Sequence, residues 1–330
     1  MPGLEQLRTL LLLARNDFSV TETARALGTS QPSISRRLQN IEEELGVALL
    51  QRRGKQIQGF THIGQQIAAH AFLVVQHLEE MVQLASGADT DNAGELNIAT
   101  THTQARYALP FVVADFVQRY PKVRLQIHQA SPEQMGTMIR NGSVDFAIAT
   151  DAFENFEDLV VLPCYRWRRC LVVPQSHALA RQSQGSGQLD SLQLLAQERI
   201  ITYSFGLWGE QGLYSLFRRH DFRPQIAITA TDAEVIKSYV RSELGLGLVA
   251  RMAVSAEQDQ DLCPVGLDDF LPHQTTGIVL SKEKYLRPAV TCFIHMFAQH
   301  LTAELVQQAQ RCSSHRKVRE LFADLAMEVR

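Results

Sequence analysis

The sequence predicts an N-terminal all-α winged helix-turn-helix, a long linker helix and a C-terminal α/β domain of two lobes. Three observations predict this division. Residues 1–60 hold three helical patterns and a basic segment with glycines, residues 61–86 sustain one apolar helical period, and strand and helix patterns alternate from residue 95 onward. The length of 330 residues also exceeds the size at which a single hydrophobic core stops growing.

The composition excludes several classes of protein. Hydrophobic residues make up 45% of the chain and charged residues 20%, which indicates a globular protein rather than a disordered one. No apolar run approaches the roughly 20 residues that span a bilayer, and the N-terminus lacks the basic start of a secretory signal. We therefore expect a cytoplasmic protein with no membrane partner. The five cysteines are scattered without a CxxC pair, so neither a disulfide framework nor a bound metal is expected.

The first sixty residues carry three successive helical patterns. The first runs from Leu4 to Arg15, and the second runs from about Val20 to Leu27, where Gly28 ends it. Ser30 is a suitable N-cap for the third helix, and Pro32 is tolerated in its first turn because that N–H has no helical partner. Two helices joined by a short turn with glycine form the helix-turn-helix pattern, whose second helix enters the major groove of DNA.

The third helix and the segment after it supply the residues expected to contact double-stranded DNA. An apolar stripe at Ile34, Leu38, Ile41 and Leu45 turns the opposite face of the helix outward. Residues 49–61 then predict a β-hairpin wing with basic side chains. The expected contacts, to base edges or to phosphates, are Ser30, Gln31, Ser33, Arg36, Arg37, Arg52, Arg53 and Lys55. The alternative is a small helical bundle with a solvated basic face.

The linker helix has the a/d spacing of a coiled coil for about three heptads. Its apolar stripe consists of Ile63, Ile67, Ala71, Val74, Leu78, Met81 and Ala85. We expect this stripe to pair with a second copy of the chain, because a monomer would leave it exposed. The alternative is a helix packed on its own C-terminal domain. Small polar residues at 86–94 then predict a hinge.

The C-terminal region predicts two α/β lobes, an architecture shared with periplasmic binding proteins. A β-α-β-α-β order over residues 96–149 predicts a parallel sheet, a second run of strands spans 170–250, and 277–280 with the helix after Pro288 returns to the first sheet. The expected domains are a winged helix-turn-helix at 1–60, a dimerisation helix with hinge at 61–94, an effector-binding domain at 95–300 and a helical tail at 301–330. Within the effector-binding domain, lobe I spans about 95–163 and 272–300, and lobe II spans about 164–271. A contribution to assembly is one role open to the tail.

Polar residues gather where strands of both lobes end, which is where ligands bind in such sheets. Hydroxyls and free backbone N–H groups can hold an anion without a fixed positive charge. A lone threonine is more often a helix cap, and the shared position of these residues is what favours a site. The expected contacts to a small anionic effector are Thr101, Thr103, Gln104, Thr150 and Thr202.

No pattern for catalysis accompanies this cleft. A Walker motif, HExxH and GxSxG are absent from the sequence, and nothing resembles a nucleophile with its base. Residues 245–250 superficially match GxGxxA, but they follow a helix pattern rather than a strand, which argues against a dinucleotide site. We therefore expect a protein that is not an enzyme, with no catalytic residues and no cofactor.

Several motifs resemble a known family of regulators. Residues 4–61 resemble the winged helix-turn-helix of LysR-type transcriptional regulators through TARALGTSQPSISR at 23–36 and EEELG at 42–46. The sensor resembles the CysB-like, cysteine-regulon branch of that family. Its motifs are ATTHTQARYALP at 99–110, DFAIAT at 145–150, LPCYRW at 162–167 and TATDAEVIKSYVR at 229–241.

The resemblance implies a tetramer built from two dimers that controls sulfur-metabolism genes, with sulfate, an acetylserine or a relative as effector and RNA polymerase as a further candidate partner. It adds Trp167 to the anion contacts and matches Thr101, Thr103, Gln104 and Thr150. One departure is Trp208, which follows Leu207 where the family pattern has a threonine, and which would reshape the cleft. The alternatives are a family member with a redox or sulfite regulon, a solute-binding protein and a metabolic enzyme.

Overall fold

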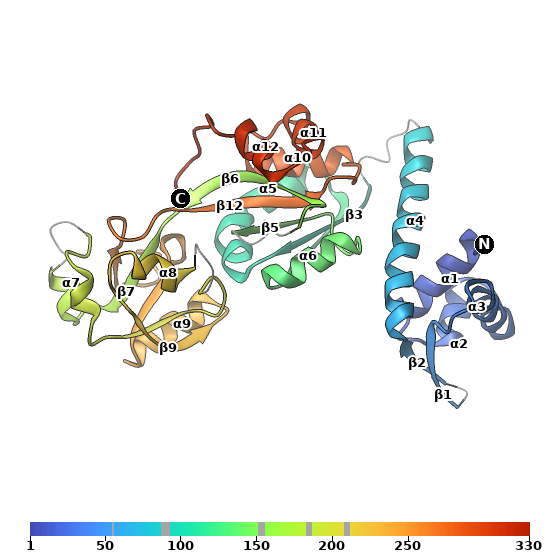
Figure 1. The fold of residues 1–330 in the computed structure, drawn as a ribbon, viewed down its shortest axis with the longest axis horizontal. Coiled ribbons are helices and arrows are strands. Elements are labelled where there is room, and N and C mark those ends of the chain that lie inside the picture. The colour runs from blue at the N-terminus through green and yellow to red at the C-terminus, as the bar shows by residue number, and fades with distance from the viewer. Residues whose placement is uncertain (55, 87–92, 151–155, 183–186, 208–211) are drawn as a thin grey trace. The chain divides into compact units, whose positions relative to one another are not determined.

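The computed structural model describes residues 1–54, 56–86, 93–150, 156–182, 187–207 and 212–330. The chain folds as two compact units (Figure 1). The first consists of residues 1–90 with 140–143, and the second consists of residues 91–139 with 144–330. The predicted hinge lies largely outside the described residues.

The first unit is a three-helix domain with a wing and a long final helix (Figure 1). Its elements are α1 (Leu4–Arg15), α2 (Val20–Ala26), α3 (Gln31–Leu45), the antiparallel strands β1 (Leu50–Arg53) and β2 (Gln56–Phe60), and α4 (His62–Ser86). The predicted winged helix-turn-helix and linker helix are confirmed. Its core contains Leu10, Leu13, Ile34, Leu38 and Ile41, so the α3 stripe packs inward as predicted.

Local capping explains where these helices begin and end. The Ser19 hydroxyl accepts a hydrogen bond from the Glu22 N–H at 3.3 Å and so caps α2. Gly46 ends α3 in the left-handed conformation at φ 68°. Ser30 occupies the predicted N-cap position of α3, but its side chain makes no capping hydrogen bond. Leu45, the last residue of the predicted stripe, is exposed rather than buried.

The second unit contains two five-stranded sheets, one in each lobe, within the described residues. Lobe I orders its strands β4-β3-β5-β12-β6, and lobe II orders its strands β11-β7-β10-β8-β9. The lobe I strands are β3 (Ala93–Thr100), β4 (Lys122–Gln129), β5 (Phe146–Thr150), β6 (Leu159–Trp167) and β12 (Gln274–Ser281). The lobe II strands are β7 (Arg169–Pro174), β8 (Arg199–Tyr203), β9 (Gln225–Ala230), β10 (Leu246–Ala250) and β11 (Leu262–Gly266).

Pairing in lobe I confirms the predicted topology. Strand β3 lies parallel to β4 and to β5, and β12 returns between β5 and β6, antiparallel to both. The sequence patterns did not predict β6 or β11. Strand β6 contains Pro163 and, near its end, Arg166, which interrupt the apolar alternation that would have indicated a strand.

Helices cover both faces of each sheet. In lobe I, α5 (Leu109–Arg119) and α10 (Pro288–Phe297) share one hydrophobic cluster, and α6 (Pro132–Arg140) belongs to another. In lobe II, α7 (Ala178–Gln182) and α8 (Leu213–Arg218) pack in one cluster, and α9 (Ala233–Arg241) in a second (Figure 1).

The helical tail belongs to the lobe I core. Its helices are α11 (Ala303–Gln310) and α12 (His315–Leu321). Val306, Val318 and Phe322 are buried in the same cluster as α5 and α10. The tail therefore completes the hydrophobic core of its own lobe.

The start of α4 makes a stability prediction, because it approaches the chain at Leu49 too closely for a side chain. A Cβ added at Gly64 would lie 2.0 Å from the Leu49 carbonyl oxygen. We expect Gly64→Ala to destabilise the first unit by about 1–3 kcal/mol or more, as overpacked sites do. Calorimetric unfolding of the full chain measures this, with Gly59→Ala as control, since a Cβ there meets nothing within 4 Å. Equal transition temperatures for the two variants would contradict the prediction.

Candidate nucleic-acid interface and effector site

The outer face of α3 carries polar side chains expected to reach base edges. Ser30, Gln31 and Arg36 are exposed, and Ser33 is half-buried. The Gln31 side-chain amide donates to the Thr21 hydroxyl at 2.7 Å, which links α3 to α2. Within the described residues, the Arg36 guanidinium has no hydrogen bond or ion pair. This leaves its donors available to another molecule.

Arg37 differs from its neighbour. Its guanidinium lies 3.1 Å from the Glu5 carboxylate and 3.4 Å from the Thr9 hydroxyl, and the side chain is only 30% exposed. The structure therefore uses this residue, which we expected at a phosphate, to join α3 to α1. The sequence pattern could not reveal the pairing, because Glu5 lies on a separate helix.

The wing is held to α3 by one carboxylate. Glu42 accepts hydrogen bonds from the N–H groups of Leu49 and Leu50 at 2.8 and 3.0 Å, and its other oxygen pairs with Arg52 at 2.8 Å. Arg53 is exposed with no ion-pair partner among the described residues. Lys55 lies outside the described residues.

The apolar stripe of α4 divides between two faces. Ala71 is buried against the first unit, together with Ala68 and Val75. Val74 and Met81 are instead 46% and 63% exposed. The Ala85 side chain lies outside the described residues, as does that of His77.

Lobe I holds a connected network of polar groups at one end of its sheet. The Trp167 indole N–H donates to the Thr150 hydroxyl at 3.0 Å, and the hydroxyl oxygens of Thr150 and Thr276 lie 3.1 Å apart. The Gln104 side chain donates from Nε2 to the Thr276 hydroxyl at 3.1 Å. At its other end, Gln104 Oε1 accepts from the Tyr165 hydroxyl. The network thus connects three residues that we expected at the site, Gln104, Thr150 and Trp167, with two that the sequence patterns missed, Tyr165 and Thr276.

Two backbone irregularities position this network. Gln104 begins a π-helical turn over Gln104–Ala108, a rare conformation often found at functional sites. The pairing of β12 with β6 shifts register between Thr276 and Gly277, which brings Tyr165 opposite Thr276. Burial raises the pKa of Tyr165 to about 12, so its hydroxyl remains a donor at neutral pH.

Lobe II meets the start of the same helix through a tyrosine. The Thr103 hydroxyl donates to the Tyr203 hydroxyl at 3.3 Å, and the Ala250 N–H donates to the same oxygen at 3.2 Å. Thr202, which we expected at the cleft, instead donates to the Leu248 carbonyl at 2.9 Å inside its own sheet. Neighbouring strand residues point to opposite faces, so Tyr203, and not Thr202, faces Thr103.

Thr101 lies half-buried where this helix begins. Its carbonyl accepts from the Ala105 N–H at 3.0 Å, and no polar contact of its side chain is formed within the described residues. Trp208 lies outside the described residues.

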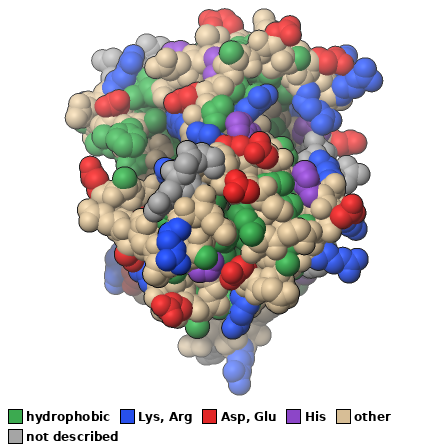
Figure 2. Space-filling view, turned by 90° about the vertical axis from the view of Figure 1, so that its left-hand side faces the viewer, with side chains coloured by type: hydrophobic (Ala, Val, Ile, Leu, Met, Phe, Trp, Pro, Cys, Tyr) green, Lys and Arg blue, Asp and Glu red, His purple; other side chains and the backbone are tan. Residues whose placement is uncertain are grey.

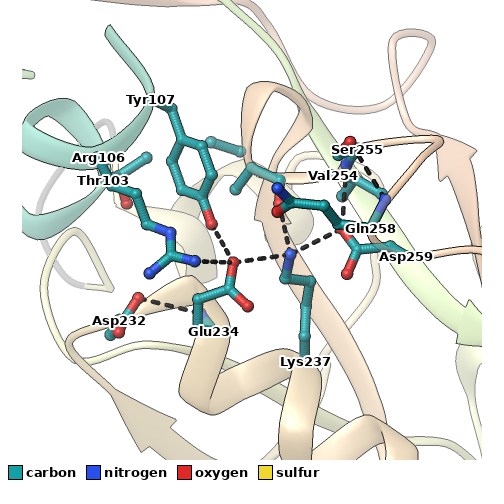
Figure 3. Close-up of polar contacts among 12 residues, drawn as sticks. Thr103, Arg106, Tyr107, Asp232, Glu234, Lys237, Val254, Ser255, Gln258 and Asp259 are labelled. Carbon is teal, nitrogen blue, oxygen red and sulfur yellow. Dashed lines mark hydrogen bonds and ion pairs between the residues drawn. The ribbon is translucent and has the colours of Figure 1, made fainter. Parts of the chain in front are cut away.

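A second polar cluster joins the two lobes beside the network (Figure 3). The Tyr107 hydroxyl of lobe I donates to the Glu234 carboxylate of α9, and the Arg106 guanidinium lies 3.5 Å from the same oxygen. Lys237 reaches that oxygen at 2.9 Å and the Asp259 carboxylate at 2.7 Å. The Lys237 side chain is only 1% exposed, so its charge depends on these partners.

The charges of this interlobe cluster are set by opposing effects. Burial alone would raise the pKa of Glu234, but hydrogen bonds from Tyr107 and Lys237 outweigh it and hold the pKa below its usual range. The pKa of Asp259 is lowered in the same way, by Lys237 and the Ser255 N–H against burial. Burial and the Glu234 carboxylate raise the pKa of Tyr107. Both carboxylates are therefore ionised at neutral pH while the tyrosine stays a donor.

The remaining chemistry of the described residues is limited. They contain no group of three His, Cys, Asp or Glu side chains that could hold a metal ion. None of the helices they form is long and apolar enough to cross a membrane. In Figure 2, acidic and basic side chains are interspersed over the coloured part of the face drawn. The coloured part of that face therefore lacks the continuous positive surface that attracts a nucleic acid.

Two family models match the chain. The model for "Bacterial regulatory helix-turn-helix protein, lysR family" matches residues 4–65. The model for "LysR substrate binding domain" matches residues 89–302. The first match lies in the first unit, and the second match covers most of the second unit.

Curated relatives match over nearly the full length. The HTH-type transcriptional regulator CysB of Haemophilus influenzae is 37% identical over 99% of this chain and 99% of its own. SsuR, another HTH-type transcriptional regulator, from Burkholderia cenocepacia, is 37% identical over 90% of this chain and 95% of its own. The regulator cbl of Escherichia coli is 32% identical over 95% and 98%.

Solved structures show the same fold. The cofactor-binding domain of the Cbl transcriptional regulator is 32% identical, with a TM-score of 0.61 over 67% of this chain and 95% of that one. Full-length CbnR, solved with its target DNA, is 19% identical, with a TM-score of 0.62 over 91% of this chain and 100% of that one. At that identity, the likeness to CbnR concerns the fold alone.

The interlobe cluster makes a prediction for acid stability. Because the pKa of Glu234 is lower in the folded chain than in the unfolded one, its contribution is complete above about pH 4.3, the ordinary glutamate value. That contribution is lost as the pH falls through the lower folded value. We expect Glu234→Gln, which keeps an acceptor oxygen without the charge, to lose less stability on acidification than the unchanged chain. Urea unfolding of the full chain at neutral and acidic pH measures this, and equal losses would contradict it.

Proposed function

The chain belongs to the lysR family of bacterial regulatory helix-turn-helix proteins, and we propose that it is a DNA-binding transcriptional regulator of sulfur-metabolism genes, switched by a small anionic metabolite. The observation that best supports this proposal is the lobe I network of Trp167, Thr150, Thr276 and Gln104. It occurs in a chain that is 37% identical to a CysB regulator over 99% of its length. The protein binds its effector without transforming it, and it has no enzymatic role.

The proposed DNA contacts come from α3 and the wing. Arg36 lies on the exposed face of α3 with its donors unused among the described residues, and Gln31 and Ser33 are near it in sequence. Arg36 is suited to guanine, since an arginine pairs bidentately with its O6 and N7. Arg53 on the wing is suited to phosphate, where Arg52 remains a second candidate despite its pairing with Glu42.

The proposed effector is sulfate, an acetylserine or a related metabolite of sulfur assimilation. The network offers an indole N–H, hydroxyls and an amide N–H, and it contains no carboxylate that would repel an anion. The helix that begins beside Thr101 adds backbone N–H groups that have no helical partner. In the structure these donors satisfy one another, so an anion must offer better acceptors than the network already has.

Effector binding is proposed to act through the contact between the lobes. Thr103 meets Tyr203, and Tyr107 meets Glu234, so the helix that holds the anion also touches lobe II at two places. A ligand that favours one arrangement of the lobes shifts the population toward it by its difference in affinity. This difference is the switch that we propose.

The regulator is proposed to act as an assembly in the cytoplasm. Val74 and Met81 leave an apolar face exposed on α4, which suits pairing with a second copy. Paired copies place two recognition helices on two half-sites. A homotetramer of two such dimers, and contact with RNA polymerase at the promoter, complete the proposal.

Arg36 tests the DNA-binding half of the proposal. We expect Arg36→Ala to weaken binding to a DNA fragment selected by the unchanged chain by about 1–3 kcal/mol, the usual loss for one bidentate base contact. Fluorescence anisotropy at fixed salt measures the affinity. Arg15→Ala, which removes the same charge from α1 outside the helix-turn-helix, serves as control. Unchanged selectivity of the Arg36 variant would remove this residue from the interface.

Thr150 and Thr202 test the effector half. Calorimetric titration of the full chain with sulfate, sulfite, thiosulfate and acetylserines identifies the anion that binds. We expect Thr150→Val to weaken that anion by about 1.5–3 kcal/mol, as when a hydrogen bond to a charged group is lost. Thr202→Val makes the same chemical change at a residue turned into its own sheet, and should leave the affinity near that of the unchanged chain. Equal losses in both variants would displace the proposed site.

A further inference from the structure

The residues after the second tail helix add a strand-like partner to the edge of lobe I. Val329 forms a parallel bridge with Arg166 of β6. The Arg166 N–H donates to the Glu328 carbonyl at 2.8 Å, and the Arg330 N–H donates to the Arg166 carbonyl at 2.7 Å. This segment lies beyond the family's substrate-binding model, which ends at residue 302. It is therefore a feature that the family match does not explain.

The pairing occurs where β6 supplies two side chains to the anion network. Tyr165 and Trp167 flank Arg166 on either side, both are buried, and both point away from the exposed arginine. The two backbone hydrogen bonds of Arg166 thus fix the strand between two donors of the network.

The side chain of Arg330 contacts the first of these donors directly. Its guanidinium carbon lies 4.3 Å from the centre of the Tyr165 ring and 6.0 Å from that of Phe297. The Nε atom donates to the Glu328 carboxylate at 2.9 Å, which holds the guanidinium in place. A cation above the ring attracts it and restrains its position.

Tyr165 in turn contacts one end of the Gln104 amide, whose other end faces Thr276. Its hydroxyl donates to Gln104 Oε1, so the donor Nε2 is directed at the Thr276 hydroxyl. A rotated amide would present its carbonyl oxygen there and repel an anion. Anion binding therefore requires the orientation of Gln104 that the structure shows, in which the Tyr165 hydroxyl is the donor to Oε1.

We propose that Arg330 is a positioning residue of the effector site: it restrains Tyr165, and Tyr165 keeps the Gln104 amide turned with its N–H group toward the anion. The inference rests on the proposed function for the identity of the ligand as an anion. It makes the segment 328–330 part of the sensor, although it never touches the effector.

Sulfate titration of the full chain tests the inference. We expect Arg330→Ala to weaken sulfate binding about three- to tenfold, within the range of one desolvated cation–π contact. Arg316→Ala removes the same charge from an exposed position of α12 and should change the affinity less than about twofold. In a Tyr165→Phe background, Arg330→Ala should have less than about a twofold further effect, because the hydroxyl through which it acts is gone. Sulfate affinity unchanged by Arg330→Ala, or an equal effect in both backgrounds, overturns the proposal.

A measurement without ligand separates this inference from the proposed function. If the unchanged chain does not bind sulfate, that part of the proposed function fails. The coupling from Arg330 through Tyr165 to Gln104, called the relay below, is still tested by urea unfolding of Arg330→Ala, Gln104→Ala and the double variant. The unfolding constant of the double variant should differ by more than about twofold from the product of the two single effects. Arg316→Ala combined with Gln104→Ala should be multiplicative. If the unfolding constant of the double variant Arg330→Ala, Gln104→Ala equals the product of the two single effects, the relay is overturned whatever the sulfate result.

Discussion

A buried amide with two unlike ends constrains the whole of lobe I. Gln104 must accept a hydrogen bond at Oε1 and donate one at Nε2, and a buried amide without either partner would be costly. Its partners lie on β6 and on β12, the second of them 172 positions along the chain. The π-helical turn and the register shift of β12 are the local adjustments that bring these groups together. Lobe I therefore has to complete its sheet before the site exists.

The other buried polar groups also depend on having all of their hydrogen-bond or ion-pair partners in place. Glu42 uses one oxygen for two backbone N–H groups and the other for Arg52, so the wing is fixed to α3 by a fully used carboxylate. Lys237 is buried only because Glu234, Asp259 and a carbonyl surround it. In each case, a charged group near a functional surface is held by at least one partner outside its own helix or strand. Such partners fix the geometry at which a second molecule must bind.

Local patterns predicted much of this architecture, and non-local pairing explains what they missed. The bounds of α1 match the prediction because its apolar period is contiguous in sequence. Gln104, Thr150 and Trp167, which we expected at one site, are connected in the network. Tyr165 and Thr276 could not be found, because only the pairing of β6 with β12 makes them neighbours. Thr202 shows the limit most sharply, since a shift of one residue in a strand turns a side chain to the opposite face.

One of the two crossings between the lobes lies close to Trp167. Arg168 alone separates β6 from β7, and it forms an ion pair at 3.0 Å with Asp268, which lies between β11 and β12 where the chain returns to lobe I. Residues 328–330 pair with β6 immediately before this point, so backbone hydrogen bonds hold this crossing one residue from Trp167. The chain has only two tryptophans. One of these two, Trp167, therefore lies beside a crossing between the lobes, where a change in the angle between them would change the surroundings of its indole ring.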